Sequence, residues 1–510
     1  MRGAPMAKNS VWRGALWLSI GSFVSKLIGA VYRIFLPRVL GDYGVGLFQM
    51  AYPLYAILLA VSVNGIPTAM AKQTAEKLSG GQREAAEHLA SWAQFALGVV
   101  GLWLGLAMEW AAPWISRALF HEPASVWAIR ALAPALTFVA LEAGFRGYFQ
   151  GRQEMRPTAV SQILEQVTRV MVMFPLAYHF LPSGVDKAAA GATVGAPIGA
   201  FAGMLFLGIE RGKAGHWSLK GRFPGRELCR LVGVALPMSF SGLLFPLMLM
   251  ADSMFVPSRL RLIGLSIEKA TAQFGQLSGE AMPLINLTMV VGAALAVSLV
   301  PAIARAIVAQ DRVGANRKVD QAIHLVWLLG LPMAGGLIIL ARPLTWLLYG
   351  ESGAAGALKV LALGSPILAI QQVMGSSLQA SGHGWVPVRN LIYGACVKFG
   401  LTWWLTAIPY WGIRGAAIGS VGAAATSAYL NWRDWTRIVG SGTHPFRRLA
   451  WPLAGTVLMA MGLHLWMIQL WGTARWLHTG LAVLLGVVIY TSVMILSGEL
   501  TAVRKSLKER

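Results

Sequence analysis

Apolar residues form runs that recur along almost the whole chain, from Trp12 to Leu496, with short polar gaps between them. Runs of about 20 residues can cross the ~30 Å hydrocarbon layer of a membrane as helices. The gaps are too short to hold a soluble catalytic domain. We therefore expect an all-α polytopic membrane protein.

The pattern predicts about fourteen transmembrane helices. The expected spans are 12–36, 43–70, 89–112, 124–150, 158–182, 185–209, 229–252, 281–305, 320–341, 356–381, 386–408, 412–432, 449–471 and 477–498. Composition supports them, because 56% of the 510 residues are hydrophobic and only 13% are charged. A soluble domain has about 25% charged residues, so division of the chain into soluble domains is excluded.

The chain is strongly basic, with 43 Lys and Arg against 21 Asp and Glu and a net charge of +22. In a soluble protein this excess would suggest nucleic-acid binding. Here most basic residues lie in the loops expected on the side of the N-terminus. Because positive loops face the cytoplasm, we expect both termini there and no nucleic-acid partner.

Segments about 230 residues apart resemble each other, which indicates an internal repeat. Arg130-Ala-Leu-Ala matches Lys359-Val-Leu-Ala, and Val194-Gly-Ala matches Val421-Gly-Ala. The repeat predicts two pseudo-symmetric six-helix lobes, and transport sites tend to lie near mid-depth between such halves. The expected regions are a first lobe at 1–210, a basic cytoplasmic linker at 211–228, a second lobe at 229–440, and two extra helices with a basic cytoplasmic tail at 441–510.

Four cations at membrane depth are our candidates for substrate binding: Lys26, Arg33, Arg169 and Lys398. A charge at this depth costs about 2.5–3.5 kcal/mol, so it points to a function. Lys26 and Arg33 are seven residues apart and share a helix face. Cations outnumber acids among the intramembrane charges. We therefore expect a cationic cavity between the halves that suits a phosphate or pyrophosphate.

The remaining intramembrane charges are candidates for ion pairs or gating: Glu142, Arg146, Glu165 and Asp252. Glu142 with Arg146, and Glu165 with Arg169, have the i,i+4 spacing with the acid first. The alternative is that these pairs neutralise themselves and only hold helices together. Asp252 is expected at the outer end of the seventh helix, as an interfacial residue.

Sequence motifs for catalysis and metal binding are absent. The chain contains neither G-x-x-x-x-G-K-[ST] nor H-E-x-x-H, and its cysteines lack paired metal-ligand spacing. We expect no catalytic residues, no metal and no cofactor.

Two groups of residues resemble a known family. One is Ser25-Lys26-Leu-Ile-Gly29 with Arg33 and Gly41-x-x-Gly44, and the other runs from Phe274-Gly-Gln-Leu-Ser-Gly279 to Ser298-Leu-Val-Pro301. They resemble the stage V sporulation protein B branch of the polysaccharide flippase family. That branch is similar to MurJ-type lipid II flippases within the multidrug/oligosaccharidyl-lipid/polysaccharide exporter superfamily.

The resemblance implies two six-helix lobes plus two helices that form a groove for a lipid tail. It implies a flippase of the bacterial cytoplasmic membrane that moves undecaprenyl-pyrophosphate-linked sugar to the outer leaflet by alternating access. Such a protein serves peptidoglycan synthesis and sporulation, with membrane lipid and cell-wall synthesis enzymes as partners. Lys26 takes the place of the family's cavity-lining basic residue. Tyr32-Arg33 replaces a basic-acidic pair.

Three alternatives stay open at this point. A multidrug/cation antiporter of the same superfamily would need an essential intramembrane acid. A membrane enzyme that polymerises lipid-linked sugars would depend on an acid near the longest outer loop, Glu268 or Glu280. A scaffold in spore-envelope assembly would not need the intramembrane cations.

Overall fold

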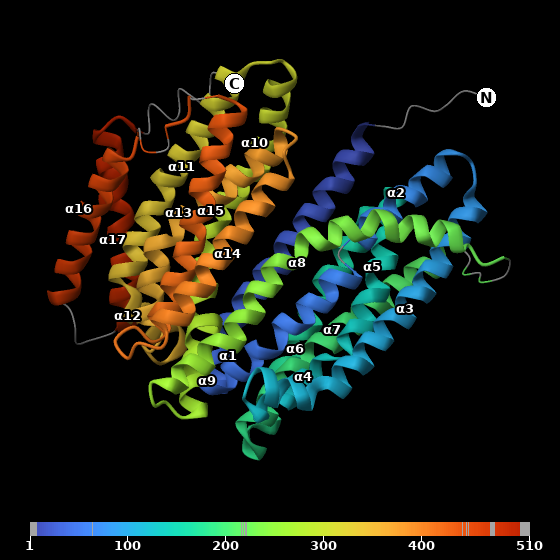
Figure 1. The fold of residues 1–510 in the computed structure, drawn as a ribbon, viewed down its shortest axis with the longest axis horizontal. Helices are drawn as coiled ribbons and strands as arrows, with labels where there is room; N and C mark the ends of the chain where they lie inside the picture. The colour runs from blue at the N-terminus through green and yellow to red at the C-terminus, as the bar shows by residue number, and fades with distance from the viewer. Residues whose placement is uncertain are drawn as a thin grey trace. The chain divides into compact units, whose positions relative to one another are not determined.

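The computed structural model describes residues 8–499 except 64, 216, 218, 220, 221, 441, 445, 447 and 470–474. Within these residues the structure is helical and contains no strand, which confirms the all-α class (Figure 1). The basic tail predicted at the C-terminus and part of the predicted 211–228 linker lie outside the described residues.

Contacts divide the chain into two compact units. Unit 1 comprises Met1–Ser258 and Ile267–Gly275, and unit 2 comprises Arg259–Ser266 and Gln276–Arg510. The helices of unit 1 are α1 (Lys8–Ser62), α2 (Ile66–Ser79), α3 (Arg83–Trp114), η1 (Ile115–Leu119), η2 (Pro123–Ser125), α4 (Val126–Leu132), α5 (Ala135–Gly151), α6 (Met155–Phe180), η3 (Leu181–Ser183), α7 (Val185–Ala214), α8 (Gly225–Leu262, whose last turn is in unit 2) and α9 (Ile267–Gly275). Those of unit 2 are η4 (Gln276–Ala281), α10 (Met282–Val308), α11 (Arg312–Ile339), α12 (Ala341–Tyr349), α13 (Ala355–Ala380), α14 (Trp385–Leu405), α15 (Ile413–Ile438), α16 (Ala450–Gln469) and α17 (Arg475–Leu496).

The described residues include ten stretches that are long and apolar enough to cross a membrane. The longest, Leu16–Ser79, covers the first two expected spans. Three other expected spans, which correspond to α6, α14 and α15, form helices but are not among the ten. Each of these helices carries charged residues along its length, and α6 packs extensively on α7 as α14 does on α15. Burial against a neighbouring helix reduces the need for a lipid-facing apolar surface.

The break expected between the first two spans occurs at Gly41. Gly41 has φ 65° and ψ 174° inside α1. A positive φ is costly for residues with a Cβ atom, so glycine fits this position. The helix therefore kinks at Gly41 and continues to Ser62.

The first turns of α8 pack in the core of unit 1. Leu231 and Ala235 are buried in one cluster with Val63 and Met70. The beginning of α8, at the end of the predicted 211–228 linker, therefore belongs to unit 1. The lobe boundaries expected from the repeat stay a prediction, because contacts group residues by packing and not by repeat.

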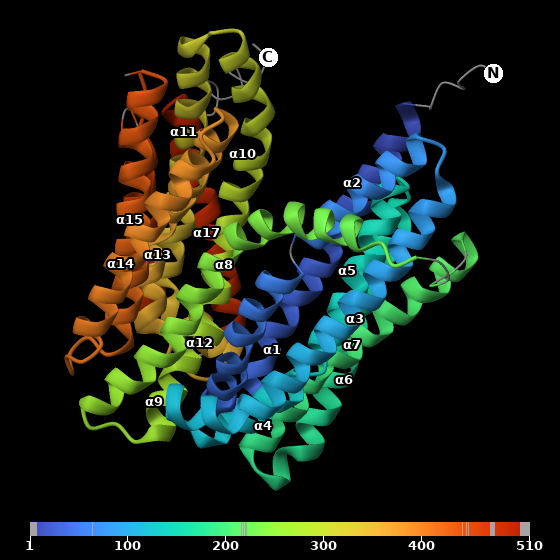
Figure 2. The same cartoon turned by 45° about the vertical axis from the view of Figure 1, so that its right-hand side comes forward.

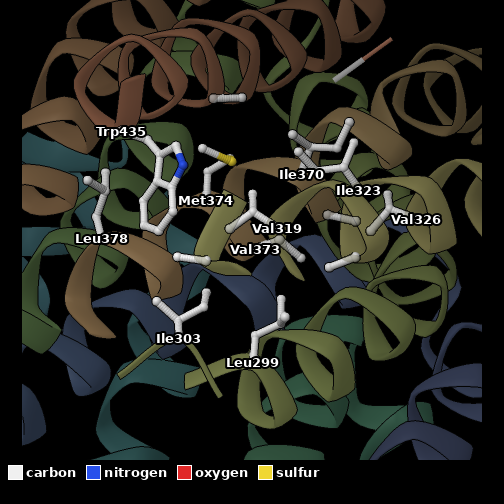
Figure 3. Packing of buried hydrophobic residues seen from close by; sticks show 14 of the residues in the cluster. Leu299, Ile303, Val319, Ile323, Val326, Ile370, Val373, Met374, Leu378 and Trp435 are labelled. Carbon is white, nitrogen blue, oxygen red and sulfur yellow. The ribbon is translucent and has the colours of Figure 1, made fainter. Parts of the chain in front are cut away.

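The core of unit 2 is formed where α10, α11, α13 and α15 pack together. Figure 3 shows Ile303, Val319, Val373 and Trp435 in this cluster. The last two helices also belong to unit 2, where α16 packs on α11 and on α17. The hydroxyl of Tyr490 donates to the carbonyl oxygen of Leu328 at 2.6 Å.

Candidate functional site

Four charged side chains of α5 and α6 form one continuous chain of ion pairs in unit 1. Arg146 Nη2 lies 3.2 Å from Glu142 Oε1 and 2.9 Å from Glu165 Oε2. Arg169 Nη2 donates to the other oxygen of Glu165, Oε1, at 2.8 Å. Both i,i+4 pairs are thus formed, and Arg146 joins them across the two helices. We call these four residues the charge ladder.

The charge ladder is neutral and largely buried. The Glu142 side chain is fully buried, and the other three side chains are 12–17% exposed. Removing one member of a buried ion pair costs about 3–5 kcal/mol, because the other charge is left uncompensated. Loss of any one member of the charge ladder should therefore destabilise the packing of α5 against α6.

The backbone of α7 approaches the Glu142 end of the charge ladder. A Cβ atom at Gly203 would overlap with Glu142 Oε1 and come within 3.3 Å of the Ser161 carbonyl oxygen. Glycine at this position therefore makes room for the buried carboxylate. Figures 1 and 2 show α6 and α7 side by side along their lengths.

Helix α1 packs along α6 in a defined register. Gly21 lies against Ala159, and Ser22 Oγ donates to Gln162 Oε1 at 2.9 Å. Three turns further along, Tyr32 is buried and interacts electrostatically with Arg33 and Arg169. The Arg169 end of the charge ladder is therefore next to α1.

Two more tyrosines of α1 lie near Arg169. They are Tyr52 and Tyr55, which follow the Gly41 kink. The hydroxyl of Tyr52 is buried and has no hydrogen-bond partner in the part of the chain that the structure describes. These phenols near Arg169 can both donate and accept hydrogen bonds.

The predicted cations of the first helix, Lys26 and Arg33, are exposed on unit 1. Within the described ranges, neither forms an ion pair with a carboxylate. Lys26 lies between the α1 positions that contact α6 at Ser22 and Gly29. Unit 1 thus combines a neutral charge ladder with two unneutralised cations on α1.

Lys398 and Asp252 are buried in the structure. Lys398 on α14 is 4% exposed, Asp252 on α8 is 8% exposed, and both have interaction partners. Helix α8 continues ten residues beyond Asp252, to Leu262. Lys398 belongs to unit 2, and its part in substrate binding stays a prediction.

Sequence reasoning missed a polar network between α14 and α15. Asp434 accepts hydrogen bonds from Arg389 and from Asn390 Nδ2, the latter at 2.9 Å. Asn390 Nδ2 also donates to Asn431 Oδ1 at 2.9 Å. The i,i+3 spacing of Asn431 and Asp434 was the available signal, since it puts both side chains on one helix face.

The two acids that a polymerising enzyme would require differ in their exposure to solvent. Glu268 is exposed on α9 in unit 1, whereas Glu280 is fully buried in η4 of unit 2. The carbonyl oxygen of Glu280 accepts a hydrogen bond from Tyr349 at 3.0 Å. This environment holds η4 in place and gives Glu280 no exposed surface for catalysis.

Comparison with known proteins identifies the relatives of this chain. It is 30% identical to stage V sporulation protein B of Bacillus subtilis over 422 residues, which cover 82% of each protein. It is 25% identical to the lipid II flippase MurJ of the same organism over 76% of each protein. The residues that resembled this family therefore indicated the correct relatives.

Solved structures show the same fold. The inward closed conformation of the lipid II flippase MurJ matches with a TM-score of 0.73 and 14% identity, covering 95% of this chain and 100% of that one. An inward-facing MATE family multidrug resistance transporter matches with a TM-score of 0.69 and 16% identity, covering 84% and 98%.

Family models agree with these similarities. Residues 237–404 match the MatE model. Residues 11–307, more than half of the chain, match the model described as polysaccharide biosynthesis protein. The chain is a multi-pass membrane protein that belongs to the polysaccharide biosynthesis protein family.

Proposed function

We propose that this protein is a flippase for undecaprenyl-pyrophosphate-linked sugar, a lipid II-like precursor or a related polysaccharide unit. It moves the sugar from the inner to the outer leaflet of the bacterial cytoplasmic membrane by alternating access, with both termini in the cytoplasm. The flipped sugar then serves cell-wall synthesis enzymes. The similarity to a sporulation protein and to a lipid II flippase supports this class of substrate.

The observation that carries the proposal is the set of cations on α1 and α6. Arg169 lies near three tyrosines, Arg33 lies next to one of them, Tyr32, and Lys26 lies two turns earlier on α1. Guanidinium groups bind phosphate through forked donors, and an ammonium adds a point charge. We propose that these three cations of unit 1 bind the pyrophosphate.

The proposal is tested in vesicles that contain the purified protein and a fluorescent undecaprenyl-pyrophosphate disaccharide. Substitutions K26A, R33A and R169A should each slow flipping about tenfold or more, because each removes a charge-assisted contact worth about 1.5–3 kcal/mol. K213A is the matched control, since Lys213 is 67% exposed and pairs with Glu210 on the same helix.

Two results would contradict the proposal. One is a wild-type protein that does not accelerate flipping over protein-free vesicles. The other is a set of three variants that flip as fast as the wild type at equal protein levels.

The match to the MatE model favours a multidrug/cation antiporter as the second candidate. That function requires an intramembrane acid that binds a proton or Na⁺ in exchange for the drug. The antiporter hypothesis predicts sodium- or proton-dependent efflux of a cationic dye, lost in E142Q and E165Q. The flippase proposal predicts no dye transport by the wild type.

A further inference from the structure

Glu165 forms ion pairs with two arginines, Arg146 and Arg169. These arginines differ in the partners that would remain if Glu165 moved away. Arg146 also lies 3.2 Å from Glu142 Oε1, and its Nε donates to Ser161 Oγ at 3.3 Å. Among the residues that the structure describes, Glu165 is the sole carboxylate in an ion pair with Arg169. If Glu165 were displaced, Arg146 would remain paired and Arg169 would not.

Two hydrogen-bond donors at Arg169 have no acceptor. Arg169 Nε and the Tyr52 hydroxyl are both buried, and neither has a hydrogen-bond partner among the described residues. Buried polar groups in native proteins nearly always have partners, and exceptions need an explanation. A ligand that accepts hydrogen bonds would satisfy both donors.

The donor set fits a phosphoryl group. The Nε–Nη edge of a guanidinium can bind two phosphate oxygens, but Glu165 occupies one donor of Arg169, Nη2. A phosphate therefore has to compete with the Glu165 carboxylate for Arg169. The carboxylate is a monoanion and the pyrophosphate carries more charge, so Arg33 and Lys26 of the same unit attract the pyrophosphate more strongly than a carboxylate.

We infer that Glu165 is an internal competitor for the substrate's pyrophosphate: it holds Arg169 in the empty protein, yields it to a phosphoryl oxygen on binding, and takes it back on release. Throughout the exchange Glu165 keeps its ion pair with Arg146. Glu165 is thus a positioning residue that sets both the affinity for the headgroup and the rate of its release. This inference rests on the proposed function.

The test measures binding of undecaprenyl pyrophosphate to the full-length protein in nanodiscs, together with flipping in vesicles. E165Q removes the competing charge, so its Kd should fall about tenfold while its flipping rate at saturating substrate decreases. E142Q is the matched control, because it removes the other carboxylate of the charge ladder, which does not pair with Arg169. Its Kd should stay within about threefold of the wild type.

For a second variant we predict the opposite change, a higher Kd for undecaprenyl pyrophosphate. The double substitution E142Q/R146Q removes one whole ion pair, so no charge is left uncompensated and Glu165 pairs with Arg169 alone. Its Kd should rise about tenfold. This variant decides the question if E165Q does not fold.

The outcomes separate the inference from the proposed function. If the wild type neither binds undecaprenyl pyrophosphate nor flips its sugar conjugate, the proposed function is wrong. If the wild type does both, the inference is overturned by an E165Q protein of normal thermal stability whose Kd is unchanged or higher. It is overturned equally by an E142Q/R146Q protein whose Kd does not rise.

Discussion

Glycine at position 203 allows the carboxylate of Glu142 to lie directly against the backbone of α7. At the scale of single residues, the charge ladder depends on such close approaches as much as on its charges. A side chain at this position would displace Glu142, which is fully buried. The glycine and the acid therefore function as one unit.

Substitution G203A should lower the free energy of unfolding by about 1–3 kcal/mol, because the added methyl overlaps with Glu142. G212A, also on α7, is the control, since a Cβ there meets nothing within 4 Å. That change should be neutral or stabilise by up to about 1 kcal/mol. Thermal unfolding of both purified variants checks this, and equal melting temperatures would contradict the account.

The sequence predicted the charge pairs but not how they connect. Spacing of four residues was enough to pair Glu142 with Arg146 and Glu165 with Arg169. The link from Arg146 to Glu165 depends on how α5 packs on α6, and a single sequence does not encode that distance in any local pattern. The burial of Lys398 was missed for the same reason.

At the scale of elements, α9 is a short helix from the second half of the chain that packs on α1 within unit 1. The contact is close because glycines face backbone on both sides: Gly46 lies against Thr271, and Gly275 against Asp42. Glu122 strengthens the contact. Its carboxylate accepts from Thr271 Oγ1 at 2.7 Å and from the Tyr43 hydroxyl at 3.3 Å.

Substitution T271V should loosen α9, because it leaves the buried Glu122 carboxylate without this donor at a cost of about 1–3 kcal/mol. Hydrogen exchange of residues 267–275 should become faster in this variant. T193V is the control, since the Thr193 hydroxyl is buried but bonds only to Ala189 O of its own helix. Unchanged exchange in T271V would show that the bond does not hold α9.

Apolar periodicity predicted most helices, and the exceptions have physical reasons. Helix α8 exceeds its expected end by ten residues and α9 follows after a short turn, so most of the expected outer loop is helical. Polar residues end the apolar span there, but Val256 and Leu260 are fully buried, so packing sustains the helix beyond that span.

At the scale of the whole molecule, length and composition were sufficient for the class of protein. Repeated apolar runs with few charges have few explanations other than a polytopic membrane protein. The family followed from short motifs on the first and eighth expected helices, and the comparisons confirm it. The sidedness and the count of fourteen spans stay predictions from charge and hydropathy.

Flipping of a pyrophosphate headgroup moves negative charge across the membrane. An inside-negative potential contributes about 2.3 kcal/mol per charge per 100 mV, so about two charges gain ~5 kcal/mol if no compensating charge moves with them. The proposed transport therefore needs no nucleotide hydrolysis. It should respond to the sign of the potential.

The most direct measurement follows wild-type protein in vesicles that contain fluorescent undecaprenyl-pyrophosphate disaccharide, with the potential set by a potassium gradient and valinomycin. We predict that flipping toward the outer leaflet exceeds that of protein-free vesicles and accelerates when the interior is negative. Flipping at the protein-free rate under both signs of the potential, with efflux of a cationic dye in its place, would contradict the central claim.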